Sequence, residues 1–82
     1  MQLHYVYILQ SIDHPEQFYT GLCGDVSARL KAHNAGQSPH TAKFKPWHLL
    51  SAHYFAEPAT AANFERYLKS GSGRAHAAKH LR

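Results

Sequence analysis

The hydrophobic pattern of the first quarter of the chain predicts two adjacent strands. Residues 3–10 are rich in Leu, Tyr, Val and Ile, and residues 17–23 form a second run of this kind. Between them lies a polar cluster, SIDHPEQ, with the Ser, Asp and Pro residues that are typical of turns. Two β-prone runs on either side of a short turn favour a hairpin. The chain is therefore expected to open with a β-hairpin.

A helix is expected directly after this hairpin. A glycine interrupts the second apolar run, and the next residue, Asp25, has a side-chain oxygen that can cap the free amide groups of a helix N-terminus. Gly36 is placed to end the helix, because glycine readily takes the left-handed conformation found at helix C-termini. The predicted helix spans residues 26–35, with Val26 and Leu30 on its buried stripe.

The second half of the chain predicts one strand and two helices. Residues 37–46, QSPHTAKFKP, lack periodicity and are expected to form an exposed loop. Residues 47–55, WHLLSAHYF, are typical of a strand buried on at least one side. Pro58 suits the first turn of a helix that continues through good helix formers to Gly71. The Ala-rich residues 73–82 predict a short final helix.

These elements follow the order β-β-α-β-α-α in a single domain, residues 1–82. A chain of 82 residues can build one modest hydrophobic core and has no room for a second domain. The order predicts an α+β fold in which a small three-stranded antiparallel or mixed sheet is flanked by helices. The sequence shows no internal repeat, linker or low-complexity tract.

Composition and charge narrow the class of protein. With 44% hydrophobic and 17% charged residues, the chain resembles folded globular domains and not disordered ones. Nine Lys and Arg residues outnumber five Asp and Glu residues. The net charge of +4 favours a polyanionic partner such as a nucleic acid, although many small basic proteins have no such partner.

The cellular setting is indicated by what the sequence lacks. The single cysteine excludes an intrachain disulfide and favours a reducing, cytoplasmic setting. No apolar run reaches the roughly 18 residues that a membrane span needs, and the first residues lack the basic region of a signal peptide. We therefore expect a protein without a membrane segment.

Tyrosines on the first two strands form one part of a candidate site. Alternate residues of a strand face opposite sides, so Tyr5 and Tyr7 share one face. Tyr19 lies two residues before Gly21, where the missing side chain permits close approach of backbone or substrate. The alternative for these tyrosines is ordinary packing in the core.

Two basic residues on the first predicted helix form a second part. Arg29 and His33 are four residues apart and therefore lie one above the other on one helix face. The helix follows the strand that carries Tyr19, which brings Arg29 near the tyrosines. The alternative is an ordinary solvated helix face.

Among the five acidic residues, only Glu65 lies inside a regular element. The others lie in the hairpin turn or at helix starts: Asp13, Glu16, Asp25 and Glu57. Hydrolysis of a phosphodiester usually requires a divalent cation, and one carboxylate is typical of Mg²⁺ sites that face phosphate. Glu65 is therefore the candidate ligand for Mg²⁺ or Mn²⁺, unless it simply pairs with Lys69 at i+4.

Three further features carry weaker signals. His76 and His80 lie at i,i+4 without a third metal ligand at a recognisable spacing. The Gly-rich segment KSGSGR, residues 69–74, lacks the features of a P-loop and is expected to form a helix-ending turn able to touch a backbone phosphate. Trp47 either packs in the core or stacks on a base.

Four motifs follow one another along the chain: YVY in the first strand, YTG in the second, an arginine with a histidine one turn later, and a glutamate in the second long helix. In this order and spacing they resemble the GIY-YIG nuclease superfamily. The resemblance covers nearly the whole chain, which looks like the small stand-alone bacterial members of that group. The chain departs from the family pattern in that the first motif reads Tyr-Val-Tyr, the second reads Tyr-Thr-Gly, and Cys23 stands where Thr or Ser is common.

The resemblance implies a role for each candidate residue. Tyr7 would help to activate the attacking water, and Tyr19 would support the site by hydrogen bonding. Arg29 would stabilise charge on the phosphate, with His33 at a position often found next to it. Glu65 would hold the single divalent ion. The products implied are a 5′-phosphate and a 3′-hydroxyl.

Two points of chemistry accompany these roles. Because a free phenol has a pKa near 10, Tyr7 can act as a base near neutral pH only if nearby positive charge favours its ionised form. Arg29 and the ion at Glu65 would supply that charge. Some family members also have a late asparagine in the site. None follows Glu65 here, so that role is empty or is filled by Ser70, Ser72 or Lys69.

The first functional hypothesis is thus a Mg²⁺- or Mn²⁺-dependent endonuclease that cuts DNA in repair, recombination or processing. The second is a nucleic-acid-binding module without cleavage activity. The basic residues expected to contact phosphates are Lys43, Lys45, Arg66, Lys69 and Arg74. So small a surface favours single-stranded, flap or branched DNA, or DNA delivered by a protein partner, over a specific duplex sequence. The sequence leaves the oligomeric state open.

Overall fold

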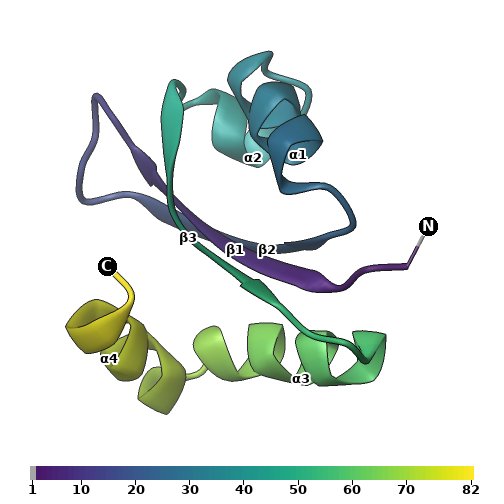
Figure 1. The fold of residues 1–82 in the computed structure, drawn as a ribbon. Coiled ribbons are helices and arrows are strands. Elements are labelled where there is room, and N and C mark those ends of the chain that lie inside the picture. The colour runs from purple at the N-terminus through teal and green to yellow at the C-terminus, as the bar shows by residue number, and fades with distance from the viewer. Residues whose placement is uncertain (1) are drawn as a thin grey trace.

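A three-stranded sheet lies between two pairs of helices in the computed structural model, which describes residues 2–82 (Figure 1). The elements in chain order are β1 (Tyr5–Ser11), β2 (Phe18–Cys23), α1 (Val26–Asn34), α2 (Pro39–Ala42), β3 (Trp47–Tyr54), α3 (Pro58–Leu68) and α4 (Gly71–His80). Helices α1 and α2 cover one face of the sheet, and α3 and α4 cover the other. The predicted α+β fold is confirmed, with α2 as an additional short helix.

The sheet is antiparallel throughout and has the order β2-β1-β3. The predicted hairpin joins β1 to β2 and sets Tyr7 opposite Gly21. Strand β3 pairs with the other side of β1, with an irregularity in register between Ile8 and Leu9. Because β1 is the central strand, its side chains reach both helix layers.

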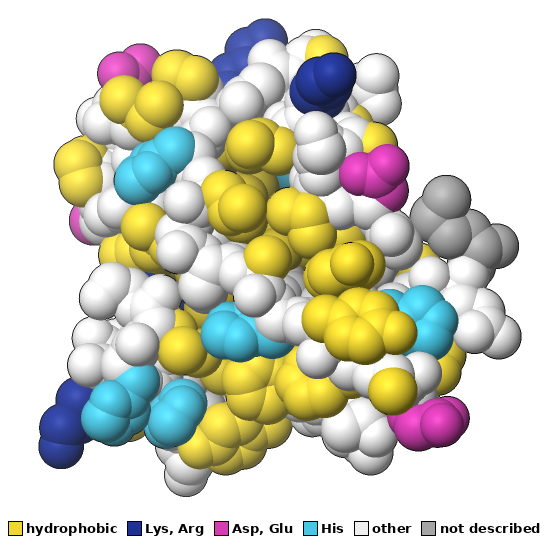
Figure 2. Space-filling view, in the orientation of Figure 1, with side chains coloured by type: hydrophobic (Ala, Val, Ile, Leu, Met, Phe, Trp, Pro, Cys, Tyr) yellow, Lys and Arg dark blue, Asp and Glu magenta, His cyan; other side chains and the backbone are white. Residues whose placement is uncertain are grey.

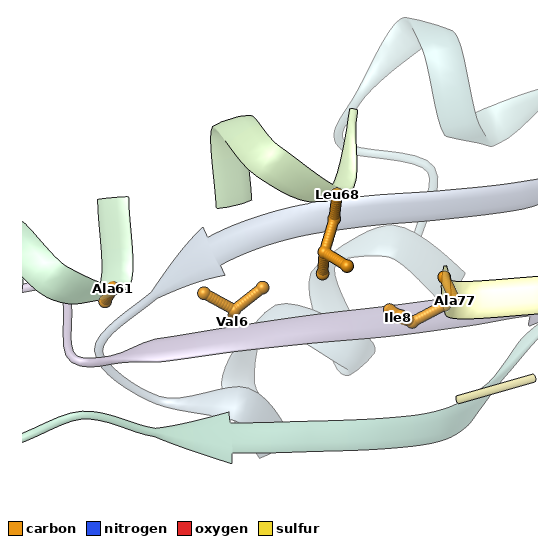
Figure 3. Close-up of a cluster of buried hydrophobic side chains, with 5 residues drawn as sticks. All are labelled: Val6, Ile8, Ala61, Leu68 and Ala77. Atoms are coloured by element: carbon orange, nitrogen blue, oxygen red, sulfur yellow. The ribbon is translucent and has the colours of Figure 1, made fainter. Parts of the chain in front are cut away.

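Alternation along β1 divides the core into two clusters. Val6 and Ile8 point toward α3 and α4, where they pack in a wholly apolar cluster (Figure 3). Tyr7 and Leu9 point the opposite way, toward α1 and α2. The apolar cluster is completed by Ala61, Leu68 and Ala77, and the second cluster by Cys23 and Trp47. Both faces of β1 are therefore packed, including the face that carries the tyrosines.

Helix α1 begins and ends as its sequence predicts. The Asp25 Oδ1 atom accepts a hydrogen bond from the backbone N–H of Ala28 at 3.0 Å. This bond satisfies one of the amide groups that a helix N-terminus leaves free. Gly36 follows the helix with φ of +78°, a conformation that favours glycine. Helix α3 likewise begins at Pro58, as predicted.

The prediction of an exposed loop over residues 37–46 is wrong for the middle of this segment, although Gln37, Lys43 and Lys45 are exposed. This segment contains α2, and its Thr41 is 1% exposed. The indole N–H of Trp47 donates to the backbone carbonyl of Thr41 at 2.8 Å, and Trp47 is 4% exposed. Trp47 is therefore a packing residue and is not available to stack on a base.

The boundary between α3 and α4 also differs from the prediction. Helix α3 ends at Leu68, and the Gly-rich segment forms the first turn of α4. The Ser70 side chain caps α4 by accepting a hydrogen bond from the N–H of Gly73 at 3.2 Å. A serine cap lets the glycines enter the helix, which is why α4 begins two residues earlier than the alanine pattern suggests.

The open edge of β3 has a surface rich in hydrophobic and histidine side chains (Figure 2). Figure 2 shows hydrophobic and histidine side chains gathered over this edge and over α3, with few Lys or Arg side chains among them. Leu49 and Tyr54 of β3 are 39% and 61% exposed.

Within residues 2–82, no helix has the length and apolar character needed to cross a membrane.

Candidate active site

A chain of buried hydrogen bonds runs from the sheet into the α1–α2 layer. The hydroxyl of Tyr7, on the central strand, lies 2.8 Å from Nε2 of His33 on α1. The other ring nitrogen of His33, Nδ1, lies 2.8 Å from the hydroxyl oxygen of Thr41 on α2. Tyr7, His33 and Thr41 are each no more than 1% exposed. The chain therefore connects three elements through groups that are shielded from bulk water.

Two more accessible residues lie against this buried chain. The ring of Tyr19, from β2, lies 4.8 Å from the His33 ring and 6.1 Å from the Tyr7 ring, centroid to centroid. Tyr19 is half-buried, and Arg29 on α1 is exposed. The guanidinium of Arg29 lies beside the Tyr7 hydroxyl, which raises the pKa of Arg29. The structure thus brings Tyr7, Tyr19, Arg29 and His33 together.

Gly21 makes room for the phenol of Tyr7. A Cβ atom at Gly21 would lie 2.5 Å from both Cζ and Oη of Tyr7. The two residues face each other across the β1–β2 ladder. The close approach predicted at this glycine is therefore made by the Tyr7 side chain.

Burial controls the protonation of Tyr7. Desolvation raises the pKa of Tyr7 to about 12, and the neighbouring Arg29 lowers it by less than burial raises it. Arg29 therefore favours the ionised phenol, as expected from the sequence, but does not outweigh burial. At neutral pH the phenol is protonated.

The partner of that phenol is a neutral imidazole. Burial lowers the pKa of His33 below its usual value, and the positive charge of Arg29 lowers it further. A neutral imidazole has one nitrogen that donates and one that accepts. In the tautomer with its hydrogen on Nδ1, His33 can accept at Nε2 a proton that Tyr7 gives up.

Glu65 lies in the other helix layer, on α3. Its carboxylate contacts the ammonium of Lys69 one turn later, at 2.6 Å, so the i,i+4 pairing considered for Glu65 is present. No hydrogen bond or ion pair within residues 2–82 joins Glu65 to the α1-side residues, and these residues contain no group of three or more His, Cys, Asp and Glu side chains able to hold a metal ion. A lone, half-buried carboxylate fits a Mg²⁺ or Mn²⁺ ion whose other ligands are water and phosphate.

A groove of about 470 Å³ lies between the open edge of β2 and the α3–α4 layer. One wall comes from β2 and includes Tyr19, and the other comes from α3, α4 and the end of the chain. The groove is lined by Glu16, Gln17, Phe18, Tyr19, Thr20, Leu68, Lys69, Arg74 and Arg82. Since Glu65 contacts Lys69, its carboxylate lies close to a groove that also reaches Tyr19.

The other predicted phosphate contacts fall in different places. Lys43 and Lys45 are exposed between α2 and β3, on the other side of the sheet from α3. Arg66 donates a hydrogen bond to the side chain of Asn63 on the same helix and does not line the groove. Of the five basic residues named from the sequence, only Lys69 and Arg74 lie in the groove.

Two of the three residues suggested for the role of the missing asparagine, Ser70 and Lys69, already have other hydrogen-bond or ion-pair partners. The Ser70 hydroxyl donates to the carbonyl of Tyr67 at 2.6 Å while it caps α4. Lys69 pairs with Glu65, and Ser72 is exposed in the first turn of α4.

Cys23 is buried, which raises the pKa of its thiol and leaves it unsuited to act as a nucleophile.

Sequence reasoning missed Thr41, which completes the buried chain of hydrogen bonds. Its segment has no hydrophobic periodicity, because α2 is a single turn of helix. The signal present was the pair Ser38 and Pro39, which occupy the N-cap and first position of α2. Serine followed by proline is typical of a helix start.

Comparison with known proteins identifies the family of this chain. A family model described as the GIY-YIG catalytic domain matches residues 3–79. A UPF0213 protein of Haloquadratum walsbyi is 37% identical over 68 residues, which cover 82% of this chain and 74% of the relative. A UPF0213 protein of Staphylococcus aureus strain Mu50 is 34% identical over 71 residues, which cover 85% and 84%. No solved structure matches the chain significantly.

Proposed function

The chain belongs to the GIY-YIG family of nucleases, and from this premise we propose that it is an endonuclease that hydrolyses phosphodiester bonds of DNA. We propose that this activity depends on Mg²⁺ or Mn²⁺. We propose further that it takes place in the cytoplasm, in repair, recombination or DNA processing. The observation that carries the proposal is the hydrogen bond of 2.8 Å between the Tyr7 hydroxyl and Nε2 of His33, made beside Arg29. It joins a proton donor to a neutral acceptor next to a fixed positive charge.

The proposed step is attack of water on phosphorus. As the water oxygen bonds to phosphorus, the water gives a proton to the Tyr7 oxygen, and Tyr7 passes its own proton to Nε2 of His33. The bond from phosphorus to the 3′ oxygen breaks, and that oxygen takes a proton from solvent. The products are a 5′-phosphate and a 3′-hydroxyl.

This concerted transfer follows from the protonation states of the two residues. A phenol with a pKa of about 12 is not ionised at neutral pH, so Tyr7 cannot act as a ready-made base. It can exchange one proton for another if a neutral base takes its own, and His33 is placed to do so.

Charge on the phosphate would be stabilised from two sides. Arg29 is exposed and always protonated, and its planar guanidinium suits the paired oxygens of a phosphate. Tyr19 would support the phosphate by hydrogen bonding through its hydroxyl. A divalent ion held by Glu65 would neutralise the developing negative charge when bound. Glu65 would have to exchange its contact with Lys69 for that ion.

The groove at the β2 edge supports the proposed preference for single-stranded, flap or branched DNA. It combines the basic residues Lys69, Arg74 and Arg82 with the aromatic residues Phe18 and Tyr19. Cations for the backbone and aromatic rings for bases are the usual means of binding single strands. Its volume of about 470 Å³ suits about one nucleotide of a strand. A protein partner that delivers DNA would extend this short contact.

Cleavage of labelled DNA tests the proposal. Single-stranded, duplex, flap and branched substrates are incubated with Mg²⁺, Mn²⁺ or a chelator, and products are separated on denaturing gels. We expect metal-dependent cutting that is lost in the Glu65→Gln and Tyr7→Phe variants. Glu57→Gln is the matched control, because Glu57 is exposed and its side chain makes no capping hydrogen bond.

The outcomes separate the two functional hypotheses. Metal-dependent cutting that persists unchanged in Glu65→Gln contradicts the assignment of the metal ligand. Salt-sensitive DNA binding without turnover under any metal favours the alternative, a nucleic-acid-binding module that does not cleave. In both cases Glu57→Gln is expected to behave as the wild type does.

The role of the groove has a separate test. Binding of a single-stranded oligonucleotide is measured with chelator present at several salt concentrations. Loss of one phosphate contact should lower the slope of log affinity against log salt by about one. We expect this change in Arg74→Ala and not in Lys79→Ala, since Lys79 lies on the same helix outside the groove. Equal slopes for both variants would exclude the groove as the strand-binding surface.

A further inference from the structure

Thr41 is a buried polar residue for which the reaction described so far gives no role. It lies on α2, a one-turn helix, and is 1% exposed. Its hydroxyl oxygen has two partners: Nδ1 of His33 at 2.8 Å and the backbone carbonyl of Ser38 at 3.4 Å. A buried hydroxyl needs such partners, because an unpaired one is costly. The chemistry of these two partners also determines which of them receives the single hydrogen of the Thr41 hydroxyl.

The position of Thr41 is fixed from the neighbouring strand. The indole N–H of Trp47 donates to the Thr41 carbonyl at 2.8 Å. The Asn34 side chain in turn holds the Trp47 backbone, accepting from its N–H at 2.6 Å and donating to its carbonyl at 3.0 Å. Asn34 directly follows His33 at the end of α1, so these bonds tie α1, β3 and α2 together around the imidazole.

The hydrogens of this chain can be assigned from the Thr41 end. A carbonyl oxygen can only accept, so in the 3.4 Å contact between Thr41 and Ser38 the Thr41 hydroxyl is the donor. In this arrangement the Thr41 oxygen accepts from His33, Nδ1 of His33 carries the hydrogen, and in a neutral ring Nε2 is left without one.

The surroundings of the Tyr7 hydroxyl agree with this assignment. The guanidinium of Arg29 lies beside that hydroxyl and has only donor groups. With the hydrogen of His33 on Nδ1, Nε2 is free to accept from the Tyr7 hydroxyl.

We propose that Thr41 is a positioning residue of the nuclease reaction: its hydroxyl oxygen accepts from Nδ1 of His33 and so holds the imidazole in the tautomer whose Nε2 receives the Tyr7 proton. The proposal rests on the proposed function for its kinetic part and on hydrogen-bond geometry for its structural part. In the other tautomer Nε2–H would point at the Tyr7 oxygen, and the proton of Tyr7 would have no acceptor.

The experiment combines spectroscopy with kinetics on the full chain. The ¹⁵N chemical shifts of the His33 ring, read by long-range ¹H–¹⁵N correlation without metal or DNA, report which nitrogen carries the hydrogen. We expect Nδ1–H in the wild type. In Thr41→Val, which has the same shape without the oxygen, we expect Nε2–H or a mixture. Thr41→Ser keeps the hydroxyl and is expected to restore Nδ1–H.

Kinetics give the second reading. Loss of one orienting hydrogen bond is expected to lower kcat about tenfold in Thr41→Val, with KM unchanged because Thr41 does not reach the surface. Thr41→Ser should recover most of the rate. Thr60→Val is the matched control, since Thr60 is exposed on α3.

Each remaining outcome overturns a defined part of the proposal. Nε2–H in the wild type contradicts the tautomer assignment and can be read even if Thr41→Val fails to fold. Nδ1–H in both wild type and Thr41→Val shows that Thr41 does not set the tautomer. A changed tautomer with unchanged kcat excludes a positioning role. If the wild type cuts no substrate under any metal, the proposed function fails, and the NMR shifts then decide the structural part alone.

Discussion

The two faces of β1 carry different kinds of core. On the α3–α4 side, Val6 and Ile8 are fully buried in a cluster made only of apolar side chains (Figure 3). On the α1–α2 side, Tyr7 is equally buried but ends in a hydroxyl that bonds to a buried histidine. Residues adjacent in sequence thus serve an apolar core on one side and a polar chain on the other.

The difference shows how so small a chain can hold reactive groups in a dry interior. Buried polar groups cost stability unless every one of them is paired. Within residues 2–82, no buried side-chain nitrogen or oxygen lacks a hydrogen-bond partner. The apolar face stabilises the fold by burial alone, and the paired polar face keeps its groups in one geometry at little net cost.

The largest effect on stability is expected on the apolar face. Ile8→Ala removes a fully buried side chain and should lower the free energy of unfolding by about 2–5 kcal/mol. Urea denaturation measures this change. The kcat of the protein that remains folded should match the wild type, because Ile8 faces away from Tyr7.

A matched control lies on the same stretch of chain. Ile12 is 54% exposed, and Ile12→Ala should alter the free energy of unfolding by no more than about 0.5 kcal/mol. A loss of kcat in the folded Ile8→Ala protein as large as that of Tyr7→Phe would show that the two faces do not act separately.

The largest effect on activity is expected on the polar face. Arg29→Ala should lower kcat about 10²- to 10³-fold, because a preorganised charge at the phosphate is removed. Its stability should change little, since Arg29 is exposed on α1. Lys31→Ala, also exposed on α1, is the control and should retain activity. Cutting by Arg29→Ala at the wild-type rate would place the phosphate elsewhere.

The elements that form both faces could be predicted because local signals mark their ends. Asp25 and Pro58 start α1 and α3 through side-chain capping and a fixed φ, and both effects act within one turn of helix. The hairpin follows from two β-prone runs around a polar turn. None of these signals depends on the rest of the fold.

The environment of the site could not be predicted in the same way. Arg29 and His33 share one side of α1 in sequence spacing, yet Arg29 is exposed and His33 is fully buried, because α2 closes over the end of α1 only. Burial of Tyr7 likewise depends on segments far apart in the chain, among them β2, α1 and β3. Such contacts between distant segments leave no periodic pattern in the sequence, and whether Glu65 binds a metal stays a prediction.

A glycine on each face offers a sharper comparison. Gly21→Ala places a methyl group 2.5 Å from the Tyr7 hydroxyl, and the phenol must move away from His33. We expect a loss of about 1–3 kcal/mol in the free energy of unfolding together with loss of cutting. Gly71→Ala, with nothing within 4 Å of the added carbon, should be neutral or stabilise α4 by up to about 1 kcal/mol.

Unfolding and cleavage measured on both variants decide this prediction. Wild-type cutting by Gly21→Ala would mean that Tyr7 does not need its present position. A large loss of stability in Gly71→Ala would mean that the first turn of α4 tolerates change no better than the β1–β2 contact.

The smallest expected effect is a difference in acid sensitivity between two histidines whose pKa is lowered by burial, His33 and His53. Burial lowers the pKa of His33 on the α1 side and of His53 on the α3 side, and only His33 also faces a positive charge, that of Arg29. Because each pKa is lower in the folded protein, the unfolded chain binds protons first as the pH falls below about 6.5. Both histidines therefore contribute stability above that pH which is lost progressively below it.

His33 should account for the larger share of this loss, since it is fully buried and near Arg29 whereas His53 is half-buried. The free energy of unfolding is measured between pH 7 and pH 5 for the wild type, His33→Gln and His53→Gln. The dependence on pH should weaken more in His33→Gln than in His53→Gln. Should His33→Gln prove too unstable, the ¹⁵N shifts of both rings in the wild type, followed with pH, give the same order. If His53 titrates at the lower pH, the charge of Arg29 does not reach His33, and the electrostatic link between the exposed and the buried parts of the site is absent.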